Sequence, residues 1–290
     1  MSTANKKDYN ASEYWSSIFA ESVDAKSVCY PEWPLSYNQF LHQQQAEKLL
    51  KILQQHAIEL TGKSILEIGP GSGFWTHFFQ TNKVKEYVGI DISKEVAANL
   101  QSRFPYYNFI NHDVGVVDET LAGIPKADII FVAMVLLHIT DDEKIDNAFS
   151  FFSQKLNDNG CFIMLDSVAA NNVFGHMKLQ AEGPEFSVAF HNKIRSMKTV
   201  ASLAKKHRLE IVDVIPAFNV SQMCFDFKTY LGYMMWGKLF YAVHRRLLHN
   251  ASENFGRKYA VFQRIFDGLL TDTLGMSMSG KWIVFRKKDS

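Results

Sequence analysis

A glycine-rich turn is the part of the sequence best suited to binding chemistry. Residues 65–73 read ILEIGPGSG, so an apolar run leads directly into Gly69, Gly71 and Gly73. Glycine permits a positive φ and lets a ligand approach the backbone closely. Asp91 ends the next apolar run, about 20 residues on, where a carboxylate can accept hydrogen bonds from ribose hydroxyls. This order of apolar run, glycine turn, helical pattern, apolar run and acid predicts a nucleoside-binding site.

Two other glycine-rich motifs, the dinucleotide-binding turn and the phosphate-binding loop, fit the residues less well. A dinucleotide-binding turn has the pattern GxGxxG or GxGxxA, and counted from Gly69 its last position is Phe74. No GxxxxGK[ST] phosphate-binding loop occurs in the chain. An NAD(P)-dependent oxidoreductase stays open as an alternative, and so does a non-catalytic nucleoside-binding or membrane-recruited partner protein.

His138 and Asp166 are the predicted proton-transfer residues, because each follows an apolar run that leads toward the same edge of the predicted sheet. Imidazole titrates near neutral pH, which suits a general base. The alternative for both is structural: His138 would bind the loop before the capping box at 140–143, and Asp166 would cap a turn. His176, Glu182 and His191 are further candidates to face a substrate.

Short apolar runs alternate with helical patterns through the chain. The sequence predicts strands at 64–68, 87–90, 109–111, 127–133, 161–165, 209–214 and 281–285. It predicts helices at 40–56, 74–80, 94–104 and 196–207, and one opened by the capping box at 140–143. The first helix should bury Ala46, Leu49, Leu50, Leu53 and Ala57, and Asn159-Gly160 should turn the chain into the fifth strand. Apolar strands separated by helices predict an α/β fold with a doubly wound, mostly parallel sheet.

The composition is that of an ordinary globular protein. The chain has 290 residues, of which 47% are hydrophobic and 21% charged, and its formal net charge is +1, which argues against a nucleic-acid partner. Its three cysteines form no CxxC pair or Cys/His cluster, so we expect neither disulfides nor a metal site. The N-terminus lacks an apolar signal core, and the stretch 129–137 is too short to span a bilayer. We therefore expect a cytoplasmic protein, with membrane association as the less favoured alternative and no prediction of oligomeric state.

Four motifs together resemble the class I S-adenosylmethionine-dependent methyltransferases, in their small-molecule branch. The motifs are EIGPGSG, Asp91 in VGID, Asn111-His112-Asp113, and the run VLLHI through His138. The resemblance covers about residues 64–214 and the last strand. It implies a seven-stranded sheet whose last strand is antiparallel, with S-adenosyl-L-methionine as the cofactor.

The resemblance also implies roles for single residues. The three glycines would line the methionine and ribose side, Asp91 would bind the ribose diol, and Asp113 and Val114 would bind adenine. Met134 would lie near the sulfonium, and we expect Tyr37 to contact the cofactor carboxylate. The full set of expected cofactor contacts is Glu67, Gly69, Gly71, Gly73, Asp91, Ile92, Asp113, Val114, Met134 and Tyr37.

The expected reaction is methyl transfer to a small-molecule acceptor. Oxygen is preferred over nitrogen or carbon because His138 and Asp166 could take a proton from a hydroxyl, and natural-product, glycan or lipid-linked acceptors would suit the aromatic segments. We expect residues 1–60 to form a helical lid segment that includes Tyr14 and Trp15. Residues 61–215 with 281–290 form the expected core, and residues 216–280 a helical insertion that covers the substrate.

Overall fold

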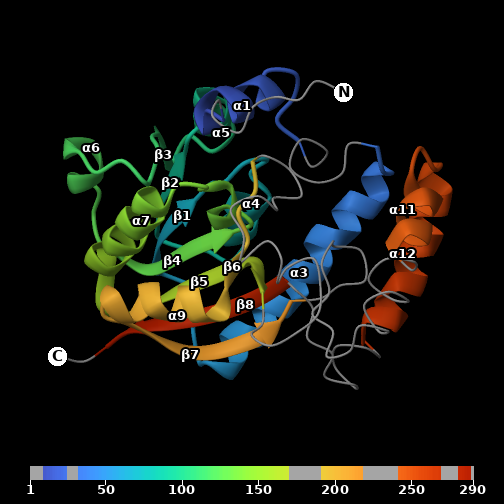
Figure 1. The fold of residues 1–290 in the computed structure, drawn as a ribbon. Coiled ribbons are helices and arrows are strands. Elements are labelled where there is room, and N and C mark those ends of the chain that lie inside the picture. Colours follow the sequence, from blue (N-terminus) through green and yellow to red (C-terminus); the bar gives the residue numbers. More distant parts are fainter. Residues whose placement is uncertain (1–8, 25–31, 170–190, 218–240, 269–279, 289–290) are drawn as a thin grey trace.

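A twisted sheet lies at the centre of the computed structural model, which describes residues 9–24, 32–169, 191–217, 241–268 and 280–288 (Figure 1). Its strand order is β3-β2-β1-β4-β5-β8-β7, with a short β6 beside β5. The strands are β1 (Ser64–Ile68), β2 (Glu86–Asp91), β3 (Asn108–Asn111), β4 (Ala127–Ala133), β5 (Leu156–Ala169), β6 (Arg195–Ser196), β7 (Leu209–Pro216) and β8 (Gly280–Lys287). Pairing is parallel from β3 to β5, whereas β8 runs antiparallel to both β5 and β7. The predicted mostly parallel sheet with an antiparallel last strand is therefore confirmed.

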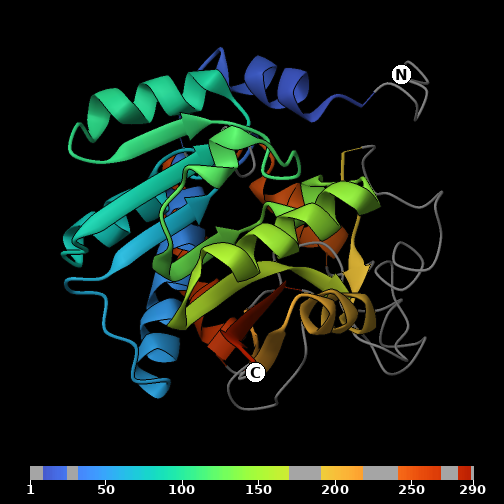
Figure 2. The same cartoon turned by 90° about the vertical axis from the view of Figure 1, so that its left-hand side faces the viewer.

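Helices cover both faces of this sheet (Figure 2). They are α1 (Ala11–Phe19), α3 (Leu35–Gln55), α4 (Phe74–Thr81), α5 (Lys94–Arg103), α6 (Glu119–Ala122), η2 (Leu136–His138), α7 (Asp142–Lys155), α9 (Met197–Lys206), α11 (Tyr241–Leu248) and α12 (Glu253–Asp267). Side chains of successive strand residues point to opposite faces, so Leu66 packs in the cluster of Phe149 from α7 and Ile65 in the cluster of Leu49 from α3. These two apolar layers fix the positions of β1, β2 and β4, so the carboxyl ends of these strands lie side by side at one edge of the sheet.

Two local predictions are corrected, and a third is refined. The first helix starts at Leu35, directly after Pro34, and its buried row includes Leu41, Leu49 and Ile52, whereas Leu50 is 47% exposed. The side chain of Asp141, one residue after the predicted capping threonine, caps α7 by accepting from the amides of Glu143 and Lys144. β5 begins at Leu156, but its register on β4 shifts across Asn159-Gly160 and regular pairing starts at Cys161, the predicted first residue of this strand.

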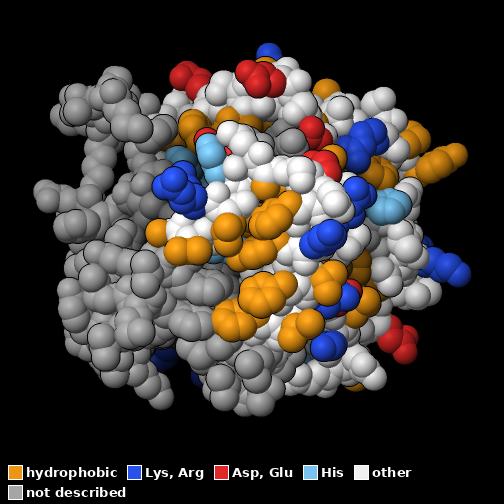
Figure 3. All heavy atoms as spheres, turned by 90° about the vertical axis from the view of Figure 1, so that its right-hand side faces the viewer, with side chains coloured by type: hydrophobic (Ala, Val, Ile, Leu, Met, Phe, Trp, Pro, Cys, Tyr) orange, Lys and Arg blue, Asp and Glu red, His pale blue; other side chains and the backbone are white. Residues whose placement is uncertain are grey.

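Helices α11 and α12 lie in the predicted insertion, and α12 packs against α3. The Glu253 carboxylate accepts hydrogen bonds from the amides of Leu35 and Ser36, both at 2.9 Å, so α12 caps the start of α3. The outer face of the helix pair shows hydrophobic side chains among cationic ones (Figure 3). The exposed apolar residues of these helices are Val243, Leu247, Phe255, Val261, Phe262 and Ile265.

Some predictions lie outside the described residues. These are the candidates His176 and Glu182 and the parts of the insertion at 218–240 and 269–279. Within the described ranges, no helix is both long and apolar enough to cross a membrane.

Candidate functional site

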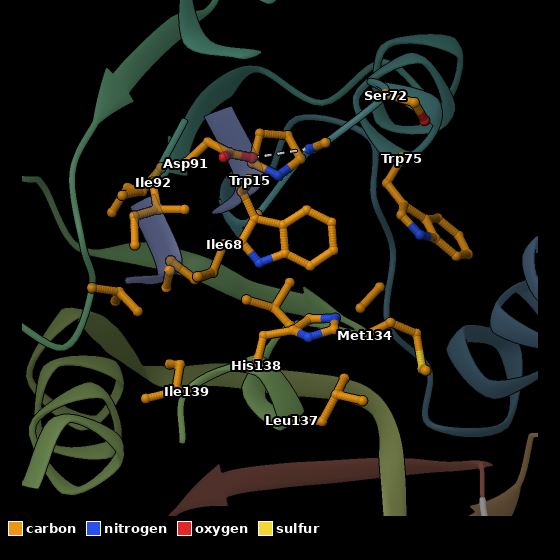
Figure 4. Close-up of a pocket in the computed structure, with 18 of the residues that line it drawn as sticks. Trp15, Ile68, Ser72, Trp75, Asp91, Ile92, Met134, Leu137, His138 and Ile139 are labelled. Carbon is orange, nitrogen blue, oxygen red and sulfur yellow. Dashed lines mark hydrogen bonds between the residues drawn. The ribbon is translucent and has the colours of Figure 1, made fainter. Parts of the chain in front are cut away.

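A cavity of about 320 Å³ opens at the carboxyl ends of β1, β2 and β4 (Figure 4). Ligands of open α/β sheets bind at this edge, because loops rather than covering helices surround it. The glycine turn, the ends of β2 and β3 and the segment after β4 form its floor, and α1 and α3 contribute to its walls. Its size is in the usual range of small-molecule sites.

The glycine turn needs its glycines for two different reasons. Gly69, Gly71 and Gly73 have φ of 67°, 52° and 80°, backbone angles that residues with a side chain rarely adopt. A Cβ on Gly69 would lie 2.4 Å from Val135, and one on Gly73 would lie 2.5 Å from Leu100, so these positions must be small for internal packing. Gly69 and Gly71 line the cavity. The turn thus presents backbone, and not side chains, to a ligand.

Asp91 links this turn to the second strand. Its Oδ2 accepts from the Gly71 amide at 3.1 Å, drawn as the dashed line in Figure 4, and its Oδ1 accepts from the Ser93 amide at 2.9 Å. The carboxyl is 6% exposed, and burial raises its pKa to about 6, although both amides oppose the shift. Each carboxylate oxygen has a second lone pair, so Asp91 can hold the turn and still accept hydrogen bonds from a ligand in the cavity.

The next polar group lies after β3. Asp113 and Val114 line the cavity, as does Ile92 after β2. The Asp113 carboxylate accepts from the Gly115 amide at 2.9 Å and pairs with Lys144 Nζ at 2.6 Å. This end of the cavity therefore combines a fixed acceptor with apolar side chains, a combination that suits a flat heterocycle.

The N-terminus of α4 is a positively polarised part of the cavity wall, in contrast to the carboxylate of Asp113. Gly73 is the N-cap residue, so the helix begins without a capping side chain from that position. The unpaired N–H groups and the helix dipole attract anions to such an end. Met134, beside it at the end of β4, has a φ of 58° and donates its amide to the Leu165 carbonyl at 2.7 Å, so its side chain is held at the cavity wall.

His138 lines the same cavity and is held as a neutral ring. Burial lowers its pKa to about 4, although the His191 carbonyl opposes the shift. Nδ1 lies 3.1 Å from that carbonyl oxygen. A carbonyl can only accept, so this contact puts the proton of the neutral ring on Nδ1 and makes Nε2 the basic nitrogen. The Asn192 side chain also bonds to the ring and opposes the lowering of its pKa.

Aromatic rings surround His138. Trp15 of α1 meets it edge-on at 4.7 Å between ring centroids, and His191 stacks on it at 5.5 Å. Tyr14 stacks in turn on His191 at 4.7 Å. Trp15 lies inside the cavity beside His138 (Figure 4), so α1 forms part of its wall. Closure of this segment over a cofactor stays a prediction.

Asp166 is not among the residues that line this cavity, where its contact with the reacting groups was predicted. Its oxygens accept from the amides of Leu137 at 3.1 Å and Ser167 at 2.7 Å. Arg195 donates to the carbonyls of Leu136 at 2.9 Å and Ile139 at 2.6 Å. Both residues thus hold the backbone of the segment that carries His138, and Asp166 is a positioning residue.

Two expected cofactor contacts also lie away from the cavity. Tyr37 is fully buried in the cluster of Trp33 and Leu248, with its hydroxyl 3.5 Å from His244 Nε2. Glu67 points into the layer under α4, because it alternates with cavity-lining Ile68, and it accepts from the Tyr87 hydroxyl at 2.5 Å. Neither side chain is among those that line the cavity.

Glu67 provides a stability test. Burial raises the pKa of its carboxyl to about 8, although hydrogen bonding to Tyr87 opposes the shift. The folded protein thus keeps a proton that the unfolded chain releases above about pH 4.5, so the free energy of unfolding falls as pH rises toward 8. Glu67→Gln should remove this decline and gain on the order of 4 kcal/mol relative to wild type between about pH 5 and about pH 9. Urea unfolding measures it, with exposed Glu86→Gln as the control; parallel curves for wild type and Glu67→Gln would contradict the assignment.

Several cavity residues were missed by sequence reasoning. They are Leu41, His42 and Gln45 of α3 and Trp75 of α4. The available signal was the position of His42 and Gln45 beside Leu41 and Leu49 on one helical face, where buried polar side chains are unusual.

Comparisons with known proteins agree with this geometry. Residues 66–162 match the family model of a methyltransferase domain. The ribosomal RNA small subunit methyltransferase A of Anaplasma marginale (strain Florida) is 29% identical over 96 residues, which are 32% of this chain and 34% of that protein. The chain thus matches about a third of the length of this curated relative.

Two solved structures share the fold. An S-adenosylmethionine-dependent methyltransferase from Clostridium acetobutylicum ATCC 824 superposes with a TM-score of 0.51 at 12% identity, over 86% of this chain and 92% of that one. DhpI in a SAM-HEP complex superposes with a TM-score of 0.51 at 16% identity, over 71% and 90%. Residues 66–162 are thus similar to a methyltransferase domain, and the strand order agrees with the fold that the motifs around the glycine turn predict.

Proposed function

We propose that this protein transfers the methyl group of S-adenosylmethionine to an oxygen atom of a small-molecule acceptor. One observation carries the proposal: Asp91, the glycine turn and neutral His138 all face a single cavity. The match to the methyltransferase family supports the type of reaction, and the structure of DhpI in complex with SAM supports the cofactor. Nitrogen and carbon acceptors are the alternatives within the same fold.

The cavity residues fit S-adenosylmethionine. The anion-attracting start of α4 suits the methionine carboxylate, and Asp91 suits the ribose diol. Asp113 and Val114 suit the adenine edge, since one offers a carboxylate acceptor and the other a backbone amide. The Cβ clashes at Gly69 and Gly73 show that the turn stays a bare backbone surface. When bound, the cofactor supplies a methyl group on a strongly electrophilic sulfonium.

The chain's own residues then exclude water, position the acceptor and accept a proton. The aromatic and apolar walls, including Trp15 and Trp75, exclude water from the site. Holding the acceptor against the methyl group can account for about 7–11 kcal/mol of a reaction barrier. Nε2 of His138 takes the proton that a hydroxyl acceptor loses when its oxygen is methylated. A base with a pKa of about 4 suffices, because a methylated oxonium is a far stronger acid than an imidazolium.

Cofactor affinity should depend on pH through Asp91. Its pKa is raised to about 6, so the carboxyl is ionised above that pH and becomes protonated below it. The ionised form is the better acceptor for ribose hydroxyls and attracts the cationic sulfonium. We therefore expect the affinity for S-adenosylmethionine to fall as pH is lowered from about 8 to about 5, by about tenfold per pH unit at the low end. Titration calorimetry across this range measures it, and a flat profile would contradict a binding role for Asp91.

The proposed function is tested by binding and by turnover. Calorimetry should detect micromolar binding of S-adenosylmethionine and S-adenosylhomocysteine and no binding of NADH. A panel of phenols, alcohols, carboxylic acids and amines should then reveal acceptors through formation of S-adenosylhomocysteine. Binding of NADH alone would establish the oxidoreductase alternative. Cofactor binding without turnover on any acceptor would favour the non-catalytic alternative, and faster turnover of amines than of hydroxyl compounds would overturn the oxygen acceptor.

A further inference from the structure

We propose that Gln45 and Ser167 form the polar end of an acceptor subsite that takes an uncharged hydroxyl or carbonyl group on an apolar body. Gln45 lies on α3 and Ser167 near the carboxyl end of β5, and both line the cavity. This inference deepens the proposed function and rests on it, because it assigns the substrate class of the same site.

Ser167 lies at the far end of the sheet edge from the nucleoside side. Asp113 follows β3, whereas Ser167 belongs to β5, and the strand order places β2, β1 and β4 between those strands. Four steps of about 4.8 Å separate β3 from β5 by roughly 19 Å along the sheet edge. Ser167 also shares a strand face with Leu165, which packs in the α3 cluster, so its side chain lies on the side of Gln45.

The polar atoms of these side chains are free for a ligand. Gln45 is 6% exposed and Ser167 is 9% exposed. Neither the Gln45 amide nor the Ser167 hydroxyl hydrogen-bonds to another residue in the part of the chain that the structure describes. Both side chains line the cavity, so a bound molecule can supply the hydrogen-bond partners that they lack within the described residues.

The charge of the surroundings defines the bound group. The other described residues at this end are Leu41, His42, Phe74, Trp75 and Met134. His42 stacks on Phe74 at 4.6 Å, and burial lowers its pKa to about 4, so it is neutral. None of these side chains carries a formal charge, so an ionised acceptor group would have no ion-pair partner among them, which is costly. Glutamine and serine each donate and accept, which suits a neutral hydroxyl or carbonyl, and the aromatic wall suits an apolar body.

Three fragments with the same body and different charge test the subsite. Para-propylphenol, para-propylbenzylamine and para-propylbenzoate are titrated by saturation-transfer NMR into the full-length protein, with and without saturating S-adenosylhomocysteine. The neutral phenol should bind at least about tenfold more tightly than either ion. Equal or tighter binding of the benzoate or the amine would overturn the proposal.

Variants assign the contact to the two side chains. Gln45→Leu and Ser167→Ala should each weaken phenol binding by about 3- to 10-fold, the effect of one hydrogen bond, without changing the affinity for S-adenosylhomocysteine. Gln43→Leu, an exposed position on the same helix, is the matched control. If both cavity variants bind the phenol as wild type does, the subsite assignment fails. If wild type does not bind S-adenosylhomocysteine, the proposed function fails, and the fragment series without it still tests the subsite.

Discussion

Substituting His138 with glutamine is expected to lower kcat by about 10²- to 10⁴-fold, the usual contribution of a general base. Glutamine fills much of the same volume but has no basic nitrogen. The dissociation constant of S-adenosylhomocysteine should change by less than about threefold, because no predicted cofactor contact is removed. Single-turnover rates and calorimetry separate these two effects.

The pH profile makes the test specific to proton transfer. Burial lowers the pKa of His138 to about 4, so the ring of the free enzyme keeps its basic lone pair across the neutral range and loses it only as pH falls toward 4. The wild-type kcat/KM should therefore show no inflection from His138 between about pH 6 and about pH 8. The residual activity of His138→Gln should rise with pH for a phenolic acceptor, which then loses its proton to solvent.

Two variants control this result. His77→Gln changes an exposed histidine on α4 and should leave kcat unchanged. Asp166→Asn should reduce kcat through position alone, since an amide nitrogen would face the Leu137 or Ser167 amide and shift the segment that carries His138. Unchanged turnover in His138→Gln would assign the ring to packing against Trp15 and exclude it as the base.

The elements that the sequence could predict are those defined by neighbouring residues. The glycine turn and Asp91 were found because close packing, positive φ and a helix start all require particular residue types within a few positions. The strands on both sides of the turn are continuous apolar runs, so β1 and β4 were predicted with their observed bounds. In this region the residues that shape the cavity and the residues that determine the local structure are neighbours in the sequence.

The errors come from contacts distant in sequence. Tyr37 packs against Leu248 and bonds to His244, both more than two hundred positions away, so no local sequence pattern could predict these contacts. Gln45 looks like an ordinary polar residue of a helix in the sequence, because only the tertiary structure shows that it lines the cavity. Asp166 ends a strand at the right edge of the sheet, but its side chain turns toward the backbone of Leu137. The fold and the glycine turn can therefore be predicted from sequence, whereas the cavity residues of α3 require the tertiary structure.

Asp91→Asn is expected to weaken S-adenosylmethionine binding by about 10- to 100-fold, because the ligand loses hydrogen bonds to a charged acceptor. The substitution preserves the size of the side chain but leaves one oxygen for the amides of Gly71 and Ser93, which the carboxylate now satisfies separately. One of those amides must then lose its partner, so the turn is less well held even before the ligand binds. The loss should thus exceed the effect of a single ribose hydrogen bond.

The same variant should also abolish the pH dependence of binding, since an amide does not titrate. Wild type and Asp91→Asn should therefore differ most at about pH 8 and converge toward about pH 5, where the wild-type carboxyl is itself protonated. Glu86→Gln, an exposed carboxylate at the other end of β2, should match wild type throughout. A constant ratio of affinities across this range would mean that Asp91 acts only by holding the turn, and equal affinities at about pH 8 would remove it from the cofactor site.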